Sequence, residues 1–392
     1  MNSDQQEIKQ NTSLLKKSTN APKSSLQILC LVRNGEFYCK QFIEYHKKLG
    51  IERFIFLDNG STDNTIAILQ EYPEVELYQC KLPYKKYWHS FKEFLLYEYG
   101  FDNWSLVLDI DEFFDFPLSQ YVEISEFISY LDYYNYNSVI THMVDLYPNK
   151  VLNDIKLNDN FLSEHKYFQE PAKKTIPIDK LTAYTNTVSN YSIEFRLGGW
   201  RHKMFDVGDV LLTKMSLIKY NKKLDFKHDH FLHNSNTADI CCSLKHYKFS
   251  SNFIDYTKES VKRKNHFNES AEYLKYSNFI NNNKEKLNFY SGGNNKVYDF
   301  ETLIQLDIFV LSPNFMAYFS HIIEKMHKPQ IGVIVTNIYK NHSKHLEELL
   351  HQQRSLLKES NSKLKAIESS ITWRVSTFIF INPINKLINI IK

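Results

Sequence analysis

The sequence predicts an α/β fold in which a mostly parallel sheet is covered by helices on both faces, followed by a helical and amphipathic C-terminal extension. Four apolar segments of strand length, 26–32, 53–57, 75–80 and 104–108, alternate with segments of helical spacing. These strands are apolar throughout, which is typical of strands that are buried on both faces. Regular alternation of strands and helices indicates parallel strands joined by crossover helices.

The segments between the strands carry helix signals of their own. Residues 36–50, EFYCKQFIEYHKKLG, place their apolar side chains on one helical face and end at a glycine stop. The turn-rich loop DNGSTDNT (58–65) leads into a short helix that Ser61 or Asp63 would cap, and HSFKEFLLYEYG (89–100) predicts a longer helix. Farther on the pattern loosens, although VITHMVDLY (139–147) still predicts a strand.

Composition divides the chain of 392 residues into four segments. We expect a disordered N-terminal segment (1–25), a main domain (26–285), an accessory segment (286–342) and a helical, amphipathic tail (343–392).

The tail allows two interpretations in each of its halves. Leu350, Leu357, Leu364 and Ile371 repeat every seven residues, but half of the matching positions four residues earlier are polar. Both a weak coiled coil, which would form a homo-oligomer through 343–371, and a long surface helix fit this pattern. The apolar end of the chain predicts either an interfacial membrane helix or a helix docked on protein. The membrane is favoured because Trp373 and interspersed cations suit a headgroup zone.

The charge and cysteine content narrow the partners and the compartment. A net charge of +3 is too small to indicate a nucleic-acid partner. Five cysteines without a C-x-x-C pair argue against a zinc knuckle and for a reduced setting. With no secretory signal and no apolar run of membrane-spanning length, we expect a cytoplasmic protein, peripheral on the inner membrane face.

Polar side chains follow three of the predicted strands at the point where each strand ends. Arg33 and Asn34 follow the first strand, Asp58 and Asn59 the second, and the 109–111 segment the fourth. Ligands bind beyond the carboxyl ends of the strands in open α/β sheets. We therefore expect these groups to converge in one binding site. There, Asp58 could accept hydrogen bonds from a nucleobase or a ribose.

The stretch LVLDIDEFF (106–114) raises the question of what compensates its carboxylates. Asp109, Asp111 and Glu112 directly follow a buried strand, and an unpaired buried carboxylate is costly. A solvated turn with a salt bridge is one answer. Mg²⁺ or Mn²⁺ held by Asp109 and Asp111 is the other, and it is favoured by their position at the strand end.

Two downstream segments offer further ligands. Four histidines lie within KHDHFLHN and LKHYKF, and His230 is our candidate for an imidazole ligand of the ion. In GGWRHKMF, Arg201 and Lys203 could reach phosphates while Trp200 stacks on a sugar or base. A surface loop with a buried Trp200 is the alternative. No P-loop, dinucleotide fingerprint or G-x-S-x-G elbow is present.

Taken together, the motifs resemble a known enzyme family. LCLVRNGE (29–36), FIEYHKKLGI (42–51), DNGSTD (58–63) and DIDEFF (109–114) resemble, in this order, a bacterial glycosyltransferase of the family 2 type, in the subgroup similar to glycosyltransferase family 92. The resemblance extends over about residues 26–280. The later SSITWRVST also resembles the endings of surface-polysaccharide glycosyltransferases, but FIFINP replaces the usual proline and arginine.

The resemblance implies a GT-A fold and a nucleotide-sugar donor, most often a UDP-sugar. Asp58 would then contact the base, Asp109 and Asp111 would meet ribose and metal–diphosphate, and His230 would complete the metal site. Inverting transfer also needs a general base, for which Asp206, Asp209 and Glu170 are candidates.

We therefore expect a metal-dependent transferase, using Mn²⁺ or Mg²⁺, that moves a sugar to a glycan, lipid-linked or protein acceptor in cell-surface polysaccharide or glycoconjugate synthesis. The alternatives are a metal-dependent nucleotidyltransferase or phosphohydrolase, and a non-catalytic scaffold that acts through the C-terminal helix.

Overall fold

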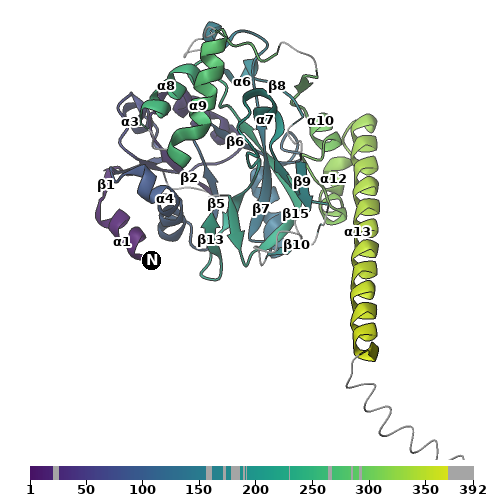
Figure 1. The fold of residues 1–392 in the computed structure, drawn as a ribbon. Coiled ribbons are helices and arrows are strands. Elements are labelled where there is room, and N and C mark those ends of the chain that lie inside the picture. Colours follow the sequence, from purple (N-terminus) through teal and green to yellow (C-terminus); the bar gives the residue numbers. More distant parts are fainter. Residues whose placement is uncertain are drawn as a thin grey trace, which may run out of the picture. The chain divides into compact units, whose positions relative to one another are not determined.

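The computed structural model describes residues 1–20, 26–155, 161–170, 174–177, 186–188, 190, 192–228, 230–263, 267–283, 286–290 and 294–369. The chain divides into two compact units, Met1–Ile338 and Tyr339–Lys392. The first unit is built on a ten-stranded sheet in the order β1-β4-β3-β2-β5-β12-β7-β15-β10, with β6 paired to β15 (Figure 1).

The strands of this sheet are β1 (Thr12–Lys16), β2 (Gln27–Val32), β3 (Phe54–Asp58), β4 (Val75–Cys80), β5 (Trp104–Leu108), β6 (Glu112–Asp115), β7 (Ser138–Asp145), β10 (Thr187–Val188), β12 (Thr213–Lys219) and β15 (Asn236–His246). Short two-stranded ladders join β8 (Tyr167–Phe168) to β16 (Lys296–Val297), β9 (Lys174–Pro177) to β11 (Glu194–Leu197), and β13 (Asp225–His228) to β14 (Phe231–His233).

The helices are α1 (Ser3–Gln10), α2 (Glu36–Lys48), α3 (Thr65–Gln70), α4 (Tyr84–Tyr99), α5 (Ile124–Tyr133), α6 (Phe161–Glu164), α7 (Gly199–Phe205), α8 (Phe253–Arg263), α9 (Phe267–Asn282), α10 (Phe300–Gln305), α11 (Pro313–Tyr318), α12 (Ser320–Ile323) and α13 (Lys328–Ser369), with a 3₁₀ turn at Leu152–Asp154.

Helices cover both faces of the sheet, as the apolar strands predicted. β2, β3, β4 and β5 are parallel neighbours, and successive side chains of a strand point to opposite faces. Ile28 and Phe54 thus enter one core with α2, α3 and α5, whereas Leu29 and Ile55 enter a second core with α1 and α4. The predicted α/β class with a mostly parallel sheet is confirmed, although β12 is antiparallel to both of its neighbours.

The N-terminal segment differs from its prediction. Residues 1–20 form α1 and β1 instead of a disordered segment, while 21–25 lie outside the described residues. Asn2 and Gln5 form a reciprocal capping box, the fully buried Ile8 enters the second core, and β1 pairs antiparallel with β4. The capping box, the buried Ile8 and the pairing of β1 with β4 outweigh the polar composition of this segment.

The segment expected to be accessory contributes to the main core. Phe300, Leu303, Phe309 and Phe315 are buried against residues of α2 and α5 in the first core cluster.

The second unit contains most of the long helix α13. Leu350, Leu357 and Leu364 are 53%, 64% and 57% exposed, so the heptad leucines project into solvent, and Ile371 and the predicted amphipathic tail lie outside the described residues. Across the described part of the chain, no helix is both long and apolar enough to cross a membrane.

Candidate active site

A pocket of about 280 Å³ lies where the carboxyl ends of β2, β3 and β5 meet. Its walls come from these strand ends, from the loop between β5 and β6, and from β15, α7, α8 and α9. Seven of the predicted site residues line it: Arg33, Asn34, Asn59, Asp109, Asp111, Arg201 and His230. The convergence that the strand ends predicted is therefore present in the structure.

Two buried lysines compensate Asp109 and Glu112, the first and third carboxylates of the D-I-D-E turn (109–112). Lys92 of α4 contacts Asp109 at 2.8 Å, and Lys214 of β12 lies 2.5 Å from Glu112 and 3.6 Å from Asp109. Both ammonium groups lie in a nearly dry environment, with Lys92 3% and Lys214 1% exposed. The turn closes on itself through two hydrogen bonds, since the Asp109 amide donates to the Glu112 carboxylate and the Glu112 amide to the Asp109 carbonyl.

A histidine faces the middle carboxylate. His246, at the end of β15, places Nε2 3.4 Å from Asp111 Oδ2, and its Nδ1 lies 2.5 Å from Asp145 Oδ1. The antiparallel register of β15 and β6 sets this approach, because His246 pairs with Glu112 next to Asp111. Burial lowers the pKa of His246, but Asp111 and Asp145 together raise it to about 9. Burial would raise the pKa of Asp111, yet His246 holds it below the ordinary value.

The charge network continues into the helical wall of the pocket. Arg201 donates from Nε to Asp145 at 2.8 Å, and its Nη1 lies 3.8 Å from Glu272 of α9, which also faces Lys248 at 3.7 Å. The Nη2 atom of Arg201 is buried and has no hydrogen-bond partner among the residues that the structure describes. Since Arg201 lines the pocket, it is suited to receive an anionic group of a ligand.

Asp58 organises a loop beside the pocket. It is fully buried, and its carboxylate accepts hydrogen bonds from the amides of Gly60 (2.9 Å) and Ser61 (3.1 Å) and from Gln79 Nε2 (3.0 Å). The same loop is tied to β2, because Asn34 accepts from the Thr62 amide at 2.8 Å and donates to Glu259 of α8 at 3.1 Å. The oxygens of Asp58 thus have protein donors, and Asp58 does not line the pocket.

Two of the predicted donor-binding residues, Trp200 and Lys203, also do not line the pocket. Trp200 is 4% exposed and packs among Tyr147, Phe249 and Phe289 at ring-centroid distances of 4.7 to 5.0 Å. Trp200 is therefore a buried core residue, as the alternative interpretation of the sequence had it. The interpretation of Trp200 as a residue that stacks on a sugar or base is corrected. Lys203 of α7 is exposed.

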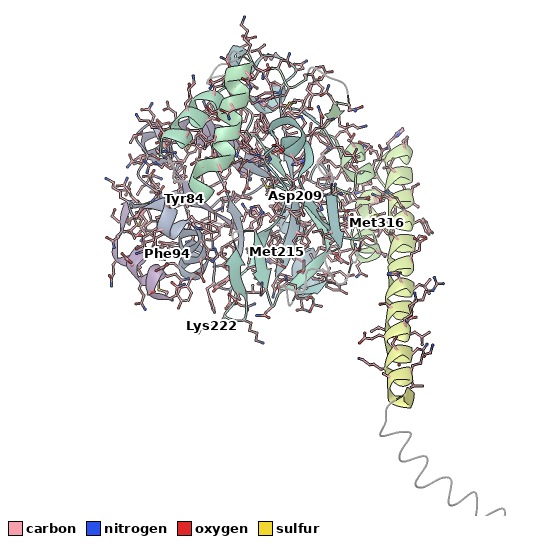
Figure 2. The ribbon with its side chains drawn as sticks, viewed as in Figure 1. Tyr84, Phe94, Asp209, Met215, Lys222 and Met316 are labelled. Atoms are coloured by element: carbon pink, nitrogen blue, oxygen red, sulfur yellow. The ribbon has the colours of Figure 1, made fainter. Side chains whose placement is uncertain are left out.

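The candidate general bases also lie outside the pocket. The Asp206 side chain is 91% exposed and pairs with Lys275 at 3.3 Å. Asp209 (labelled in Figure 2) and Glu170 are exposed as well, and neither lines the pocket. A base must come within hydrogen-bond reach of its proton donor, so the structure does not support these three assignments.

His230 lies in the pocket wall with a defined orientation. Its Nδ1 lies 2.9 Å from the Thr213 carbonyl. This bond makes Nδ1 the protonated nitrogen and Nε2 the basic one, which is the arrangement found in metal-ligating histidines.

The sequence did not single out Lys92, Lys214, Asp145 or the tyrosines of the pocket, Tyr38, Tyr84, Tyr256 and Tyr273. A signal existed for Lys92, which interrupts the apolar face of its helix between Phe91 and Leu95. Lys214 and Asp145 end up beside the D-I-D-E turn only through the pairing of β12 with β5 and of β7 with β15.

Comparison with known proteins identifies the family of the chain. A search of curated proteins gave no match. The sequence model of glycosyltransferase family 92 matches residues 37–288. This span contains the pocket-lining ends of β3 and β5 as well as His230 and His246. As this span covers more than half of the chain, the protein belongs to glycosyltransferase family 92.

Proposed function

We propose that the protein transfers a sugar from a nucleoside diphosphate donor, with UDP as the first nucleotide to test, to a glycan, lipid-linked or protein acceptor in cell-surface polysaccharide or glycoconjugate synthesis. The observation that carries the proposal is the Asp111–His246–Asp145 line at the carboxyl edge of the sheet. A carboxylate, an imidazole and a buried guanidinium, one nitrogen of which has no partner among the described residues, suit a metal–diphosphate group.

The residues present fit a divalent ion. Among the described residues, no three His, Cys, Asp or Glu side chains form a cluster that could hold a metal alone. Mg²⁺ and Mn²⁺ sites of phosphate-transferring enzymes need fewer protein ligands, because substrate phosphates complete them. Two neighbouring ligands of an octahedral ion lie about 3 Å apart, close to the 3.4 Å between Asp111 and His246. Such an ion would neutralise the leaving diphosphate as a Lewis acid.

The proposal assigns a role to the main polar residues in and around the pocket. Asp111 and His246 would hold the ion, while Asp145 fixes the imidazole by accepting from Nδ1. Asp109, kept in place by Lys92 and 43% exposed at its side chain, would accept from the ribose hydroxyls. His230 is the second candidate imidazole ligand. Arg33, Asn34, Asn59 and Arg201 would bind the rest of the donor. Asp58 would act by shaping the loop that the base meets.

The decisive assay is release of nucleoside diphosphate from a panel of nucleotide sugars with Mn²⁺, Mg²⁺ or EDTA. We expect metal-dependent release from one donor, at least 100-fold lower in Asp111→Asn and unchanged in Lys203→Ala, which alters an exposed residue of α7. Turnover of nucleoside triphosphates or phosphoesters instead would indicate a nucleotidyltransferase or phosphohydrolase. No turnover together with no thermal stabilisation by any nucleotide and metal would indicate a scaffold.

A binding experiment separates the two histidines. Mn²⁺ affinity, measured by electron paramagnetic resonance in the presence of UDP, should fall at least tenfold in His246→Gln and Asp145→Asn. If only His230→Gln weakens Mn²⁺ binding, His230 is the ligand and His246 serves the Asp111 carboxylate alone.

For α13 and the tail we propose peripheral contact with the cytoplasmic membrane face and self-association through 343–371. The exposed heptad leucines support the second proposal. Sedimentation of wild type beside Leu357→Glu tests self-association, since the charge should dissociate an oligomer built on this seam. Flotation with anionic vesicles tests the membrane contact, and wild type remaining with the soluble fraction would contradict it.

A further inference from the structure

A second pocket lies on the opposite face of the ladder that carries the active-site residues. In the β6–β15 ladder, Glu112 pairs with His246, Phe113 with Lys245, and Asp115 with Ser243. Because side chains alternate across a strand, Glu112 and His246 face the active-site pocket, whereas Lys245 and Asp115 face the other way. They line a cavity of about 330 Å³, somewhat larger than the active-site pocket of about 280 Å³.

The floor of this second pocket is a charged and hydrogen-bonded network. Lys245 lies between the rings of Tyr45 and Tyr298, 4.9 and 4.8 Å from their centroids, and contacts Asp115 at 3.2 Å. Asp115 also accepts from the Tyr298 hydroxyl at 3.0 Å and from Ser119 at 2.6 Å. Buried ion pairs are often no more stabilising than apolar residues of the same volume. Stability alone therefore gives no reason for this arrangement.

The wall of the second pocket contains a strained residue. Leu118, in the loop after β6, has φ +67°, a left-handed conformation that a leucine rarely adopts. Such backbone is energetically costly and is concentrated at ligand-binding sites. The loop also presents Tyr121, which is 46% exposed, at the pocket mouth.

The pocket continues into a neighbouring cavity, so it suits an elongated ligand. A further cavity of about 220 Å³ shares Lys48, Leu49, Ser119, Gln120 and Tyr121 with it. The combined groove has aromatic and aliphatic walls with hydroxyl, amide and charged groups at the rim and floor. An oligosaccharide matches this surface, because the C–H face of a sugar ring packs on aromatic side chains while its hydroxyls bond polar groups.

We infer that the groove over Tyr121, Tyr298 and Lys245 is an oligosaccharide-binding site, distinct from the active-site pocket on the other face of the β6–β15 ladder. The inference rests on the proposed function, in which a glycan is an acceptor of the enzyme. It deepens that function by assigning a binding site to this acceptor. A distal part of the acceptor held here would keep the glycan near the enzyme between transfers and raise its effective concentration.

Saturation-transfer NMR on the full chain tests the site with maltohexaose, laminarihexaose, chitohexaose and mannohexaose as probes. UDP and Mn²⁺ are included so that the donor pocket is filled. We expect saturation transfer to at least one probe, and affinity at least tenfold lower in Tyr121→Ala. Tyr133→Ala is the matched control, since Tyr133 is 70% exposed and lies on α5 outside the groove. Tyr298→Phe, which keeps the ring and removes the bond to Asp115, should weaken binding to a smaller extent.

The outcomes separate this inference from the proposed function. Asp111→Asn should abolish donor turnover and leave probe binding intact, whereas Tyr121→Ala should do the reverse. Binding of none of the four probes, or equal binding by Tyr121→Ala and Tyr133→Ala, overturns the site whatever the donor assay gives. A wild type that binds a probe, releases no nucleoside diphosphate and is not stabilised by any nucleotide with metal retains the site and refutes the transferase.

Discussion

Replacement of Lys214 by methionine tests whether the buried ion pair between Lys214 of β12 and Glu112 holds the D-I-D-E turn in place. Lys214 and Glu112 lie 2.5 Å apart and are 1% and 2% exposed, so neither charge reaches bulk water. Methionine fills similar space but leaves the Glu112 carboxylate buried without its partner. Removing one member of a buried pair typically costs about 3–5 kcal/mol. We expect a loss of that size in the free energy of unfolding.

A double-mutant cycle separates this effect from loss of side-chain volume. Glu112→Gln keeps an oxygen acceptor near Lys214, which retains Asp109 at 3.6 Å, so it should cost about 1–3 kcal/mol. In Lys214→Met/Glu112→Gln the uncompensated charge is gone. The double variant should therefore be about 2 kcal/mol more stable than the sum of the single losses predicts.

Urea unfolding followed by far-ultraviolet circular dichroism, in EDTA so that bound metal does not contribute, gives all four free energies. Additivity within about 0.5 kcal/mol would show that the two groups are not coupled. A loss below about 1 kcal/mol in Lys214→Met would show that water or another cation reaches Glu112. Either result would refute the argument that Lys214 secures the turn.

Three further predictions follow from the surroundings of single side chains. His46 is buried, its Nδ1 lies 2.8 Å from the Phe42 carbonyl, and burial lowers its pKa from 6.5 to about 3. The unfolded chain thus binds one proton more between these pH values, and stability falls on acidification below pH 6.5. His46→Gln should reduce that fall in urea titrations by up to about 1.4 kcal/mol per pH unit. Arg201→Lys loses the guanidinium fork and should raise the donor KM at least tenfold in the release assay, whereas Lys203→Ala should leave it unchanged. Trp200→Ala should cost about 3–5 kcal/mol in urea unfolding. Trp200→Phe should cost about 1 kcal/mol, because the indole nitrogen has no hydrogen-bond partner in the described part of the chain. Lower donor affinity in Trp200→Phe at unchanged stability would restore the stacking role.

The fold was predictable because its signal is local. Apolar runs such as 53–57 and 104–108 are short, continuous and bounded by polar turns, so their burial follows from composition alone. The position of the site followed from the same pattern, since parallel strands bring their carboxyl ends to one edge. For this reason Arg33, Asn59 and Asp111 could be placed in one pocket before any contact was known.

The sequence was a weaker guide where position depends on distant elements. Trp200 and Asp206 lie in a segment without strand or helix periodicity, so nothing local determined whether they face the pocket. Trp200 instead joins an aromatic cluster with Phe249 and Phe289, far along the chain. His230 was preferred to His246 from its motif, although only the register between β15 and β6 reveals that His246 faces Asp111.

The partners of the three carboxylates explain why one of them is suited to an ion. Asp109 and Glu112 are paired with the ammonium groups of Lys92 and Lys214, and an ammonium has no lone pair to offer a metal. Asp111 faces an imidazole, which can be a cation beside the carboxylate or a neutral ligand next to it. The lysines thus compensate the two outer carboxylates, whereas under the proposed function the pair at Asp111 would exchange a proton for a divalent ion. The turn would then combine a fixed framework with one exchangeable position, and Asp111 lines the pocket where the diphosphate would lie.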